Sequence, residues 1–556
     1  MLRAAPTLTL ALFLAPVGAG LIGTFLPAFG FLPALGGQAF SLEPWRTLFG
    51  APGFPTALAL TLGVGFAATL VSFVLACGFC ALTVQSTWVR GCERALAPLL
   101  ATPHVAVAVG FAFLIAPSGW IARLISPELT GWDRPPALVT VRDPYGFSFA
   151  VGLVLKEVPY LVLMMLAASG QVAVRPLLAA ARGMGYSATT AWAKVVLPLI
   201  YRQIRLPVYA VLAFSLSTVE VGLILAPGNP PPLSVLALRW YQAPDLALAF
   251  PAAAASLLQL LIVAAAIVLW HGGERLAWVL GRPWIRGGAR RGTVVPVLAG
   301  AGGLAIAAGT LSFLSLAGLA LWAFTAEWRY PDAFPTRWSL APWSRLGDST
   351  APVVNTLLIG VAAALAAVAL ALACLENEAR RGARPGPSVL WLLYLPLLVP
   401  QIAFLFGMQT VFIRLGVDGS LIAVVWAHLL FVLPYVFLSL ADPFRALDPR
   451  FARIAAGLGR TPARVFWRVK LPMLLRPVLV AFAIGFAVSV DQYLATLFAG
   501  AGRIATLTTE AVTLSSGGDR RLVAVTIALQ AALPLLAFAL ALVLPPIIHS
   551  NRSSLR

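Results

Sequence analysis

Charged side chains are scarce in this chain of 556 residues. Asp, Glu, Lys and Arg together make up 11% of the sequence, hydrophobic residues make up 60%, and the mean hydropathy is +0.91. A soluble domain carries roughly a quarter of its residues as charged side chains, which keep its surface hydrated. The composition therefore excludes a soluble globular protein and predicts a chain that crosses a membrane several times.

Lysine is rarer still, which excludes a phosphate-loop nucleotide site. The three lysines are Lys156, Lys194 and Lys470, and they follow Leu, Ala and Val. A phosphate loop needs Gly-Lys-Ser or Gly-Lys-Thr after a glycine-rich turn. The sequence also lacks paired carboxylates, a nucleophile elbow and the His/Glu spacings of metalloenzymes. We therefore expect no enzymatic activity, metal site or cofactor in this chain.

The four cysteines are too few and too scattered for a disulfide framework. Cys77, Cys80 and Cys374 lie in apolar runs, and Cys92 lies in a short polar loop. The C-x-x-C spacing of Cys77 and Cys80 lacks the histidine or second cysteine pair that a zinc site requires. We expect these cysteines to be small helix-packing residues.

Apolar runs of spanning length, at roughly 20 residues per span, occur six times in each half of the chain. An even number of spans leaves both termini on one side of the membrane. The expected spans of the first half are 7–29, 56–84, 96–117, 147–168, 206–227 and 247–270. Those of the second half are 294–324, 352–375, 388–413, 420–441, 477–499 and 522–548.

Two polar segments share one spaced pattern. The first reads Ala-Ala-Ala-Arg-Gly-Met-Gly over 179–185, and the second reads Arg-Ile-Ala-Ala-Gly-Leu-Gly over 453–459. An aliphatic residue, a leucine and a proline follow 10, 12 and 13 residues after each second glycine. One such segment is typical of a basic amphipathic surface helix, but two in the same register favour a common docking role.

The residues around each second glycine predict a helix, a turn and a second helix. Gly185 and Gly459 can end a short helix in the left-handed conformation. Ser187 and Thr461, two residues later, are good caps for the helix that follows. Pro462 comes next, at the first helical position, where its missing N–H costs little.

This spacing resembles the EAA loop of binding-protein-dependent ABC importer permeases, whose pattern is Glu-Ala-Ala, three residues, Gly, nine residues, Ile, one residue and Leu-Pro. The resemblance implies a cytoplasmic element that docks on a separate ATPase subunit. The leading Glu of the pattern is Ala179 in the first segment and Arg453 in the second, so its contacts must be absent or rebuilt here. The matching residues, expected to form two ATPase-coupling loops, are Ala180, Ala181, Gly185, Leu197, Pro198, Ala455, Gly459, Leu471 and Pro472.

The resemblance extends over nearly the whole chain. It implies an all-α polytopic membrane protein with the type I importer permease fold, built from two homologous six-helix transmembrane bundles. We expect a first half at 1–280 with its loop at about 175–205, and a second half at 294–556 with its loop at about 445–476. The linker at 281–293 continues a Gly- and Arg-rich stretch from about residue 271 and is expected to be a flexible cytoplasmic tether.

Shorter repeats support two halves with the same topology. Pro103 and Gly110 are seven residues apart in the expected third span of the first half, and Pro400 and Gly407 repeat this step in the second. A Pro-Tyr pair also precedes each loop, at 159–160 and 434–435. The halves are therefore expected to be related in parallel.

The net charge of +19 is concentrated on one side of the expected topology. With the two loops placed in the cytoplasm, the basic excess falls on cytoplasmic segments, as the positive-inside rule requires. We therefore assign the charge to topology and anionic lipid headgroups and not to nucleic acid. The opposite orientation would translocate Arg275, Arg282, Arg286, Arg290, Arg291, Arg380, Arg381 and Arg384.

Carboxylates at membrane depth are costly, so they should face a partner or a hydrated cavity. Glu220 and Asp491 both fall in the expected fifth span of their half, as pore-lining residues of the translocation path or as a structural gate. Lys156 and Glu157 are expected to pair with each other at the start of the fourth helix. His104 and His428 are expected to make hydrogen bonds between helices.

Taken with the resemblance, the sequence predicts a permease subunit in the bacterial inner membrane, with both termini cytoplasmic. Two copies of a cytoplasmic ABC ATPase would bind ATP and Mg²⁺, and a periplasmic binding protein would deliver the solute. The alternative is a twelve-helix secondary transporter of the major facilitator type. Ferric iron, thiamine, a polyamine or an anion would all be compatible solutes, with the ferric iron and thiamine permeases as the nearest class.

Overall fold

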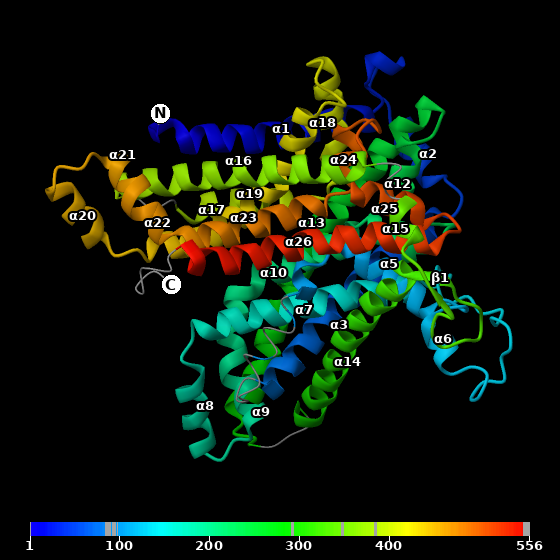
Figure 1. The fold of residues 1–556 in the computed structure, drawn as a ribbon, viewed down its shortest axis with the longest axis horizontal. Helices are drawn as coiled ribbons and strands as arrows, with labels where there is room; N and C mark the ends of the chain where they lie inside the picture. The colour runs from blue at the N-terminus through cyan, green and yellow to red at the C-terminus, as the bar shows by residue number, and fades with distance from the viewer. Residues whose placement is uncertain are drawn as a thin grey trace.

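The computed structural model describes residues 2–83, 91, 96, 98–290, 294–345, 350–382 and 386–548. Within these ranges the protein is built almost entirely from helices (Figure 1). Ten helices are long and apolar enough to cross a membrane, and two further pairs, bent by 103° and 76°, raise the number to as many as twelve. The all-α polytopic class is confirmed. Cys92 lies outside the described residues, whereas Cys77 and Cys80 are buried in a helix.

The first half forms the helices η1 (Leu2–Ala4), α1 (Ala5–Ala28), η2 (Pro33–Leu35), α2 (Glu43–Phe49), α3 (Phe54–Thr83), α5 (His104–Ile115), α6 (Trp120–Leu124), α7 (Phe147–Gly170), α8 (Val174–Gly183), α9 (Ala188–Ala191), η3 (Trp192–Val196), α10 (Leu197–Ser217), α11 (Glu220–Leu225), α12 (Leu233–Tyr241), η4 (Leu246–Leu248) and α13 (Ala249–Arg286).

The second half forms α14 (Val294–Ala323), α15 (Ala341–Arg345), α16 (Ala351–Arg381), α17 (Pro387–Leu398), α18 (Ile402–Arg414), α19 (Leu421–Arg445), α20 (Pro449–Gly457), α21 (Pro462–Val465), η6 (Phe466–Lys470), α22 (Leu471–Met473), α23 (Leu475–Val490), α24 (Leu494–Ala499), α25 (Leu507–Ser515) and α26 (Arg520–Ile548). Between α14 and α15, strands β1 (Thr325–Glu327) and β2 (Arg337–Trp338) form a short antiparallel hairpin.

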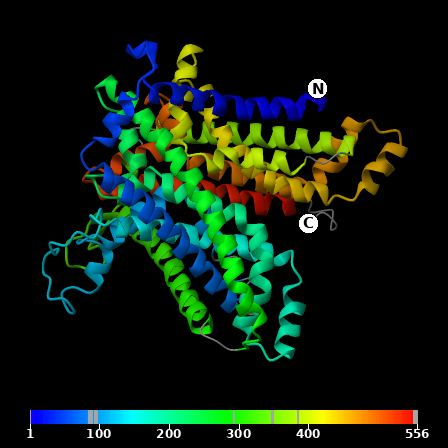
Figure 2. The same ribbon diagram turned by 180° about the vertical axis from the view of Figure 1, so that it is seen from behind.

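The two halves exchange their first helices. Helix α1 packs against α16 and α18 of the second half, whereas α14 packs against α3, α5 and α7 of the first half. Figures 1 and 2 show α1 lying along the second bundle and α14 lying along the first. Each bundle therefore contains one helix from the other half of the chain, a feature that the order of the spans did not predict.

The repeated glycines of the third spans explain how closely the exchanged helices approach. A Cβ at Gly407 would overlap the carbonyl oxygen of Gly20 on α1, and one at Gly110 would lie 2.6 Å from the carbonyl oxygen of Ser315 on α14. Small residues allow backbones to approach in this way, which is how helices gain van der Waals contact where lipid removes the hydrophobic driving force. The glycine repeat thus marks both crossings.

The bundles meet at one end and diverge at the other. In Figures 1 and 2, α8 and α9 on the first bundle lie far from α20 and α21 on the second. At the opposite end, called the hairpin end here because it holds β1 and β2, α25 packs against α5 and α11 of the other half. Helix α1 begins and α26 ends on the side of α20 and α22, which agrees with both termini lying on one side.

Two expectations from the sequence are corrected. The third spans, expected to be continuous over 96–117 and 388–413, break at Pro103 and Pro400, because proline cannot donate the helical hydrogen bond. The flexible tether expected from residue 271 is helical as far as Arg286. Glu274 holds that helix against α10, through a hydrogen bond of 2.6 Å from the Tyr201 hydroxyl and an ion pair of 3.0 Å with Arg205.

Candidate functional site

The two segments that share the glycine pattern fold alike, and they are called the first and second coupling loops here. In the first loop, α8 ends before Gly185, which has a φ of +88°, and α9 follows. In the second, α20 ends before Gly459, with a φ of +73°, and α21 follows. Ser187 accepts the Thr190 N–H at 3.2 Å, and Thr461 accepts the Arg464 N–H at 3.4 Å. The predicted turns and caps are confirmed.

Both loops widen into one π-helical turn before their Leu-Pro pair. The Leu197 N–H bonds to the carbonyl of Trp192, and the Leu471 N–H bonds to that of Phe466, five residues back in each case. The next residues, Pro198 and Pro472, have no N–H to continue the α-helical ladder, so the chain enters the membrane helices through this wider turn. Each Leu-Pro pair is therefore the junction between a coupling loop and its bundle.

The loops bury one alanine and expose one larger apolar residue each. Ala181 and Ala455, at the same position of the pattern, are 2% and 8% exposed. Met184 and Leu458, which stand between the two glycines of each pattern, are 58% and 76% exposed. The Gly-x-Gly spacing marks these tips, although no prediction from the sequence included them. Ala180 is also exposed.

The linker holds the first coupling loop. The Lys194 ammonium group donates to the carbonyl oxygen of Ala289 at 3.0 Å and lies 4.7 Å from the ring centre of Trp284, near the end of α13. The Ser187 N–H donates to the carbonyl oxygen of Arg290 at 3.2 Å. Cation–π contacts and backbone bonds of this kind restrain the loop without using a carboxylate.

The second coupling loop is held instead by ion pairs with α16. Glu376, which is 4% exposed in its side chain, lies 2.7 Å from Lys470 and 2.7 Å from Arg380. Arg380 also donates to the carbonyl oxygen of Pro462 at 3.2 Å. Nearby, Glu378 accepts two hydrogen bonds from Arg445, at 2.8 and 2.9 Å, which join α16 to α19. The two loops thus share a fold but have different anchors.

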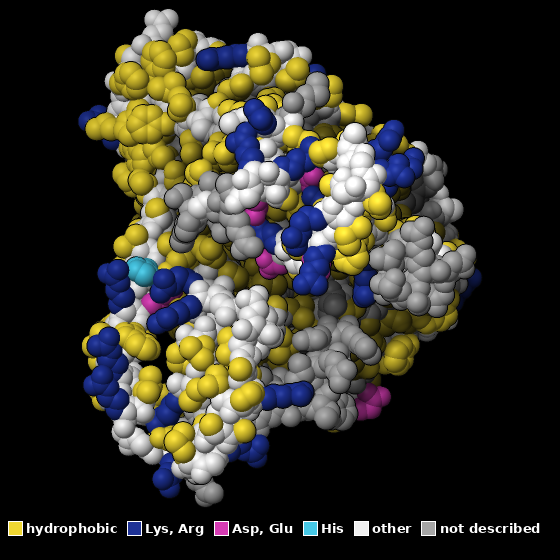
Figure 3. Space-filling model, turned by 90° about the vertical axis from the view of Figure 1, so that its left-hand side faces the viewer, with side chains coloured by type: hydrophobic (Ala, Val, Ile, Leu, Met, Phe, Trp, Pro, Cys, Tyr) yellow, Lys and Arg dark blue, Asp and Glu magenta, His cyan; other side chains and the backbone are white. Residues whose placement is uncertain are grey.

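Basic side chains surround the loops. Figure 3 looks onto the left-hand side of Figure 1, where the loop ends lie, and shows Lys and Arg spread over this face with few acidic groups. This distribution agrees with the one-sided positive charge of the sequence and with a face that meets anionic headgroups or an acidic partner.

The fifth spans are broken at the predicted carboxylates, which corrects the continuous spans expected over 206–227 and 477–499. Helix α10 ends at Ser217 and α11 begins at Glu220, whereas α23 ends at Val490, directly before Asp491. Free carbonyl groups at membrane depth need partners. The hydroxyl of Ser234 donates to the Thr218 carbonyl at 3.0 Å, and that of Thr508 donates to the Val490 carbonyl.

Asp491 lies against the first half of the chain. Its carboxylate accepts the backbone N–H of His104 at 2.9 Å and contacts the His104 ring nitrogen Nδ1 at 2.5 Å. Glu220 is buried on α11. His428 bonds to Ser489 at 2.7 Å and to Thr496 at 2.9 Å, both across helices of its own half. The interhelical roles of the two histidines are confirmed, and that of His104 joins the two halves.

Lys156 and Glu157 do not form the expected ion pair. The Lys156 ammonium group donates to backbone carbonyls in the segment that precedes α5, including that of Leu99 at 2.9 Å. Glu157 instead faces the ring nitrogen Nε2 of His104 at 3.8 Å. Successive residues of a helix point in different directions, so neighbours in sequence do not pair. Both residues lie in the middle of α7 and not at its start.

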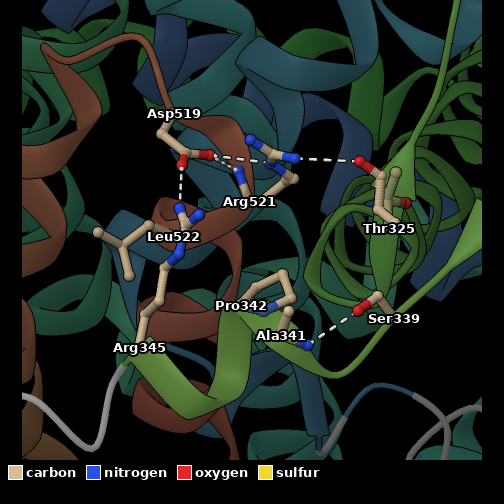
Figure 4. Close-up of a pocket in the computed structure, with 9 residues that line it drawn as sticks. Thr325, Ser339, Ala341, Pro342, Arg345, Asp519, Arg521 and Leu522 are labelled. Carbon is tan, nitrogen blue, oxygen red and sulfur yellow. Dashed lines mark hydrogen bonds and ion pairs between the residues drawn. The ribbon is translucent and has the colours of Figure 1, made fainter.

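The hairpin end holds two hollows. One of about 450 Å³ is lined by residues around Phe111, Asp143 and the exposed Tyr145. The other, of about 100 Å³, lies between the hairpin and α26 (Figure 4), where Asp519 pairs with Arg345 at 3.4 Å and with Arg521 at 3.2 Å. The charged groups of this second hollow are paired with one another, which marks it as part of the rim and not as a solute site.

Paired coupling loops on two bundles with exchanged first helices define a membrane-embedded transport subunit. No family model matches the chain. It is 34% identical over 523 residues, 93% of each chain, to the inner membrane ABC transporter permease protein YnjC of Escherichia coli strain K12. The chain therefore belongs to the family of ABC transporter permeases and is a multi-pass inner-membrane protein.

Shorter matches link parts of the chain to other permeases. It is 34% identical over 165 residues, 27% of its length and 58% of the relative's, to the molybdenum transport system permease protein ModB of Mycobacterium tuberculosis. It is 23% identical over 115 residues, 21% of its length and 44% of the relative's, to the spermidine/putrescine transport system permease protein PotC of E. coli strain K12. These relatives favour the ABC permease over the major facilitator alternative.

Proposed function

We propose that the chain is the whole transmembrane part of an ATP-driven importer, with both coupling loops and both termini in the cytoplasm of a bacterial cell. A periplasmic binding protein delivers solute at the hairpin end. Two copies of a separate ATPase subunit, which bind ATP and Mg²⁺, each grip one loop. The observation that carries this proposal is the pair of loops with the same caps, the same left-handed glycine and the same π turn, each with an exposed apolar tip.

The loops are built to transmit movement. Each runs through its π turn into the Leu-Pro junction of α10 or α22, so that displacement of the tip moves the membrane helices with it. Met184 and Leu458 supply apolar contact area for a groove on the partner. Lys and Arg are spread over the face on which the loop ends lie (Figure 3). The unequal anchors imply that the two ATPase subunits meet loops of unequal stiffness.

Glu220 and Asp491 are the candidates for the translocation path. Both carboxylates lie where the fifth spans break, between the coupling loops and the hairpin end. Relatives named for molybdenum and for spermidine/putrescine belong to the same family, so membership leaves the solute open. Ferric iron and thiamine, which the overall resemblance favours, stand beside polyamines and anions as candidates.

Co-purification tests the proposal. We expect a phosphate-loop ATPase and a secreted binding protein to be encoded beside this chain. The tagged chain should carry two ATPase subunits when it is co-expressed with that ATPase, and vesicles holding the complex should hydrolyse ATP faster when the binding protein is present. Leu458→Asp should remove most of the ATPase, because it places a charge in an apolar groove. Gly459→Arg should also abolish transport while the chain stays in the membrane, because the position needs a positive φ.

A matched substitution separates docking from general damage. Leu129 is 82% exposed and lies in the segment that follows α6, toward the hairpin end. Leu129→Asp therefore introduces the same charge far from the loops and should leave the bound ATPase unchanged. Wild-type amounts of ATPase on the Leu458→Asp variant would overturn the docking role of the second loop.

A further inference from the structure

A polar side-chain contact at membrane depth joins the broken third span of the first bundle to the broken fifth span of the second. His104 is the first residue of α5 in the first half, and Asp491 follows the last residue of α23 in the second. The carboxylate accepts a hydrogen bond of 2.9 Å from the free backbone N–H of His104 at the start of α5, and it contacts the ring nitrogen Nδ1 of His104 at 2.5 Å. Two bonds on one carboxylate fix the relative position of two broken helices.

Three largely buried carboxylates near the coupling loops form ion pairs with a different role. Those of Glu274, Glu376 and Glu378 each join two residues of the same half and lie near the coupling loops. They hold elements of one half together, whereas His104 and Asp491 tie one bundle to the other. The contact therefore responds to relative movement of the bundles and not to movement within one of them.

The surroundings of the contact strengthen it. The His104 ring packs against Phe214 with 4.5 Å between ring centres, and its far nitrogen Nε2 faces Glu157 at 3.8 Å. Side-chain exposures of 22% for His104 and 21% for Asp491 leave little room for water. A hydrogen bond to a carboxylate that is mostly shielded from water is worth more than the same bond at a surface.

We propose that the contact between His104 and Asp491 is a latch that holds the bundles together toward the hairpin end while the coupling loops are apart. This inference rests on the proposed function, because an importer must alternate between states open to opposite sides. The structure has the loops apart and the latch closed. Bringing the loops together must separate the bundles toward the hairpin end, so the latch must part before solute passes.

A latch of this kind sets the balance between two states. His104→Ala removes the bond between the imidazole and the carboxylate, and Asp491→Asn weakens it by replacing the charged acceptor with a neutral amide. Both leave a partner for the backbone N–H, whereas Asp491→Ala removes both bonds. In the first two variants we expect the population with the loops together to increase about tenfold relative to the population with the loops apart. The loss of one hydrogen bond to a charged group accounts for a change of this size. Asp491→Ala should shift the ratio further.

The distance between the loop tips reports the state directly. Spin labels at Met184→Cys and Leu458→Cys, in a background without Cys77, Cys80, Cys92 and Cys374, give that distance by pulsed dipolar spectroscopy in lipid nanodiscs without nucleotide. The wild-type chain should show the long distance, and the variants should gain a shorter one. In the double variant His104→Ala/Asp491→Asn the shift should equal that of His104→Ala alone, because both substitutions act on the same bond.

His428→Ala is the matched control. His428 is also a buried imidazole bonded to the broken fifth span of the second half, but its partners Ser489 and Thr496 belong to its own half. It should lower stability without changing the distance between the tips. The latch is refuted if Asp491→Asn and Asp491→Ala keep the wild-type distance, if the single shifts add, or if His428→Ala shifts the distance as much. The measurement needs no ATPase, so its failure is distinct from a failure to bind one.

Discussion

Lys470, the last residue of the π turn in the second coupling loop, lies 2.7 Å from the carboxylate of Glu376 on α16. The corresponding residue of the first loop is Val196, which is fully buried and carries no charge. The same structural position is thus filled by an ion pair in one half and by an apolar contact in the other. The second loop is anchored by ion pairs with a carboxylate, and the first is anchored without one.

Removing that anchor should loosen the second loop. Glu376→Gln leaves two cations without their carboxylate and should lower the free energy of unfolding by about 2 kcal/mol, less than for a fully buried pair because both cations are partly hydrated. It should also weaken the stimulation of ATP hydrolysis by binding protein. Glu378→Gln breaks the neighbouring pair with Arg445 at similar cost but should keep the stimulation. Equal loss in both variants would contradict a specific link to the loop.

The first loop should depend on Lys194. Lys194→Met removes the bond to the Ala289 carbonyl and the contact with Trp284, so hydrogen exchange at residues 184–190 should become several-fold faster. Arg468 holds the same place in the second loop and is exposed. Arg468→Met should leave exchange at 458–464 unchanged. Unaltered exchange in Lys194→Met would show that the linker does not restrain the loop.

The crossing of α1 and α18 should not tolerate a side chain. Gly407→Val places atoms inside the backbone of α1 at Gly20 and Gly23, and it should cost at least about 3 kcal/mol of stability or displace α1. Gly18 also lies on α1, but it has open space beside it. Gly18→Ala should therefore be neutral or stabilising by up to roughly 1 kcal/mol. Thermal unfolding in detergent compares the two, and a destabilised Gly18→Ala would contradict this crossing.

Asp143 should make stability depend on pH at the acid end. Burial acts to raise its pKa, but hydrogen bonds from the Ser148 hydroxyl and from the backbone N–H groups of Ser148 and Phe147 outweigh burial, so its pKa is lowered. A lowered pKa in the folded state gives stability that is present above the unfolded pKa of about 3.9 and is lost as pH falls through the folded pKa. Asp143→Asn should cost about 1 kcal/mol at pH 7. The melting temperatures of the two proteins should converge as the pH falls through the folded pKa of Asp143, and a constant difference would rule out this titration.

Local chemistry made the coupling loops readable from the sequence. A glycine with a positive φ, a hydroxyl cap two residues later and a Leu-Pro pair are determined by neighbouring residues, and Gly185, Ser187 and Thr461 behave as predicted. The apolar spans are also readable from the sequence, because the hydrophobic composition of a segment determines whether it can cross the membrane. The exposure of Met184 and Leu458 was predictable from the sequence, because the glycines on either side of each residue have no side chains to shield it.

Contacts between distant segments were not readable in this way. The sequence placed Asp491 inside a continuous apolar span, because the hydroxyls of Ser234 and Thr508 that support the breaks come from other helices. The sequence predicts an ion pair between Lys156 and Glu157 because the two residues are adjacent in the chain. It does not reveal that the backbone carbonyl of Leu99 lies beside Lys156 in the fold. The seven-residue spacing from Pro to Gly is visible in the sequence. Only the structure shows that these glycines allow α1 and α14 to pass close to the third spans.

The exchange of first helices has a consequence for biosynthesis. The ribosome makes α1 first, yet its binding surface on α18 exists only after residue 414 has left the exit tunnel. During that interval α1 sits in the bilayer with its glycine face exposed to lipid or to other insertion factors. Fusion of both halves into one polypeptide keeps the waiting helix within reach of the surface that it will cover, so assembly is an intramolecular search whose rate does not depend on how much of the protein the cell makes.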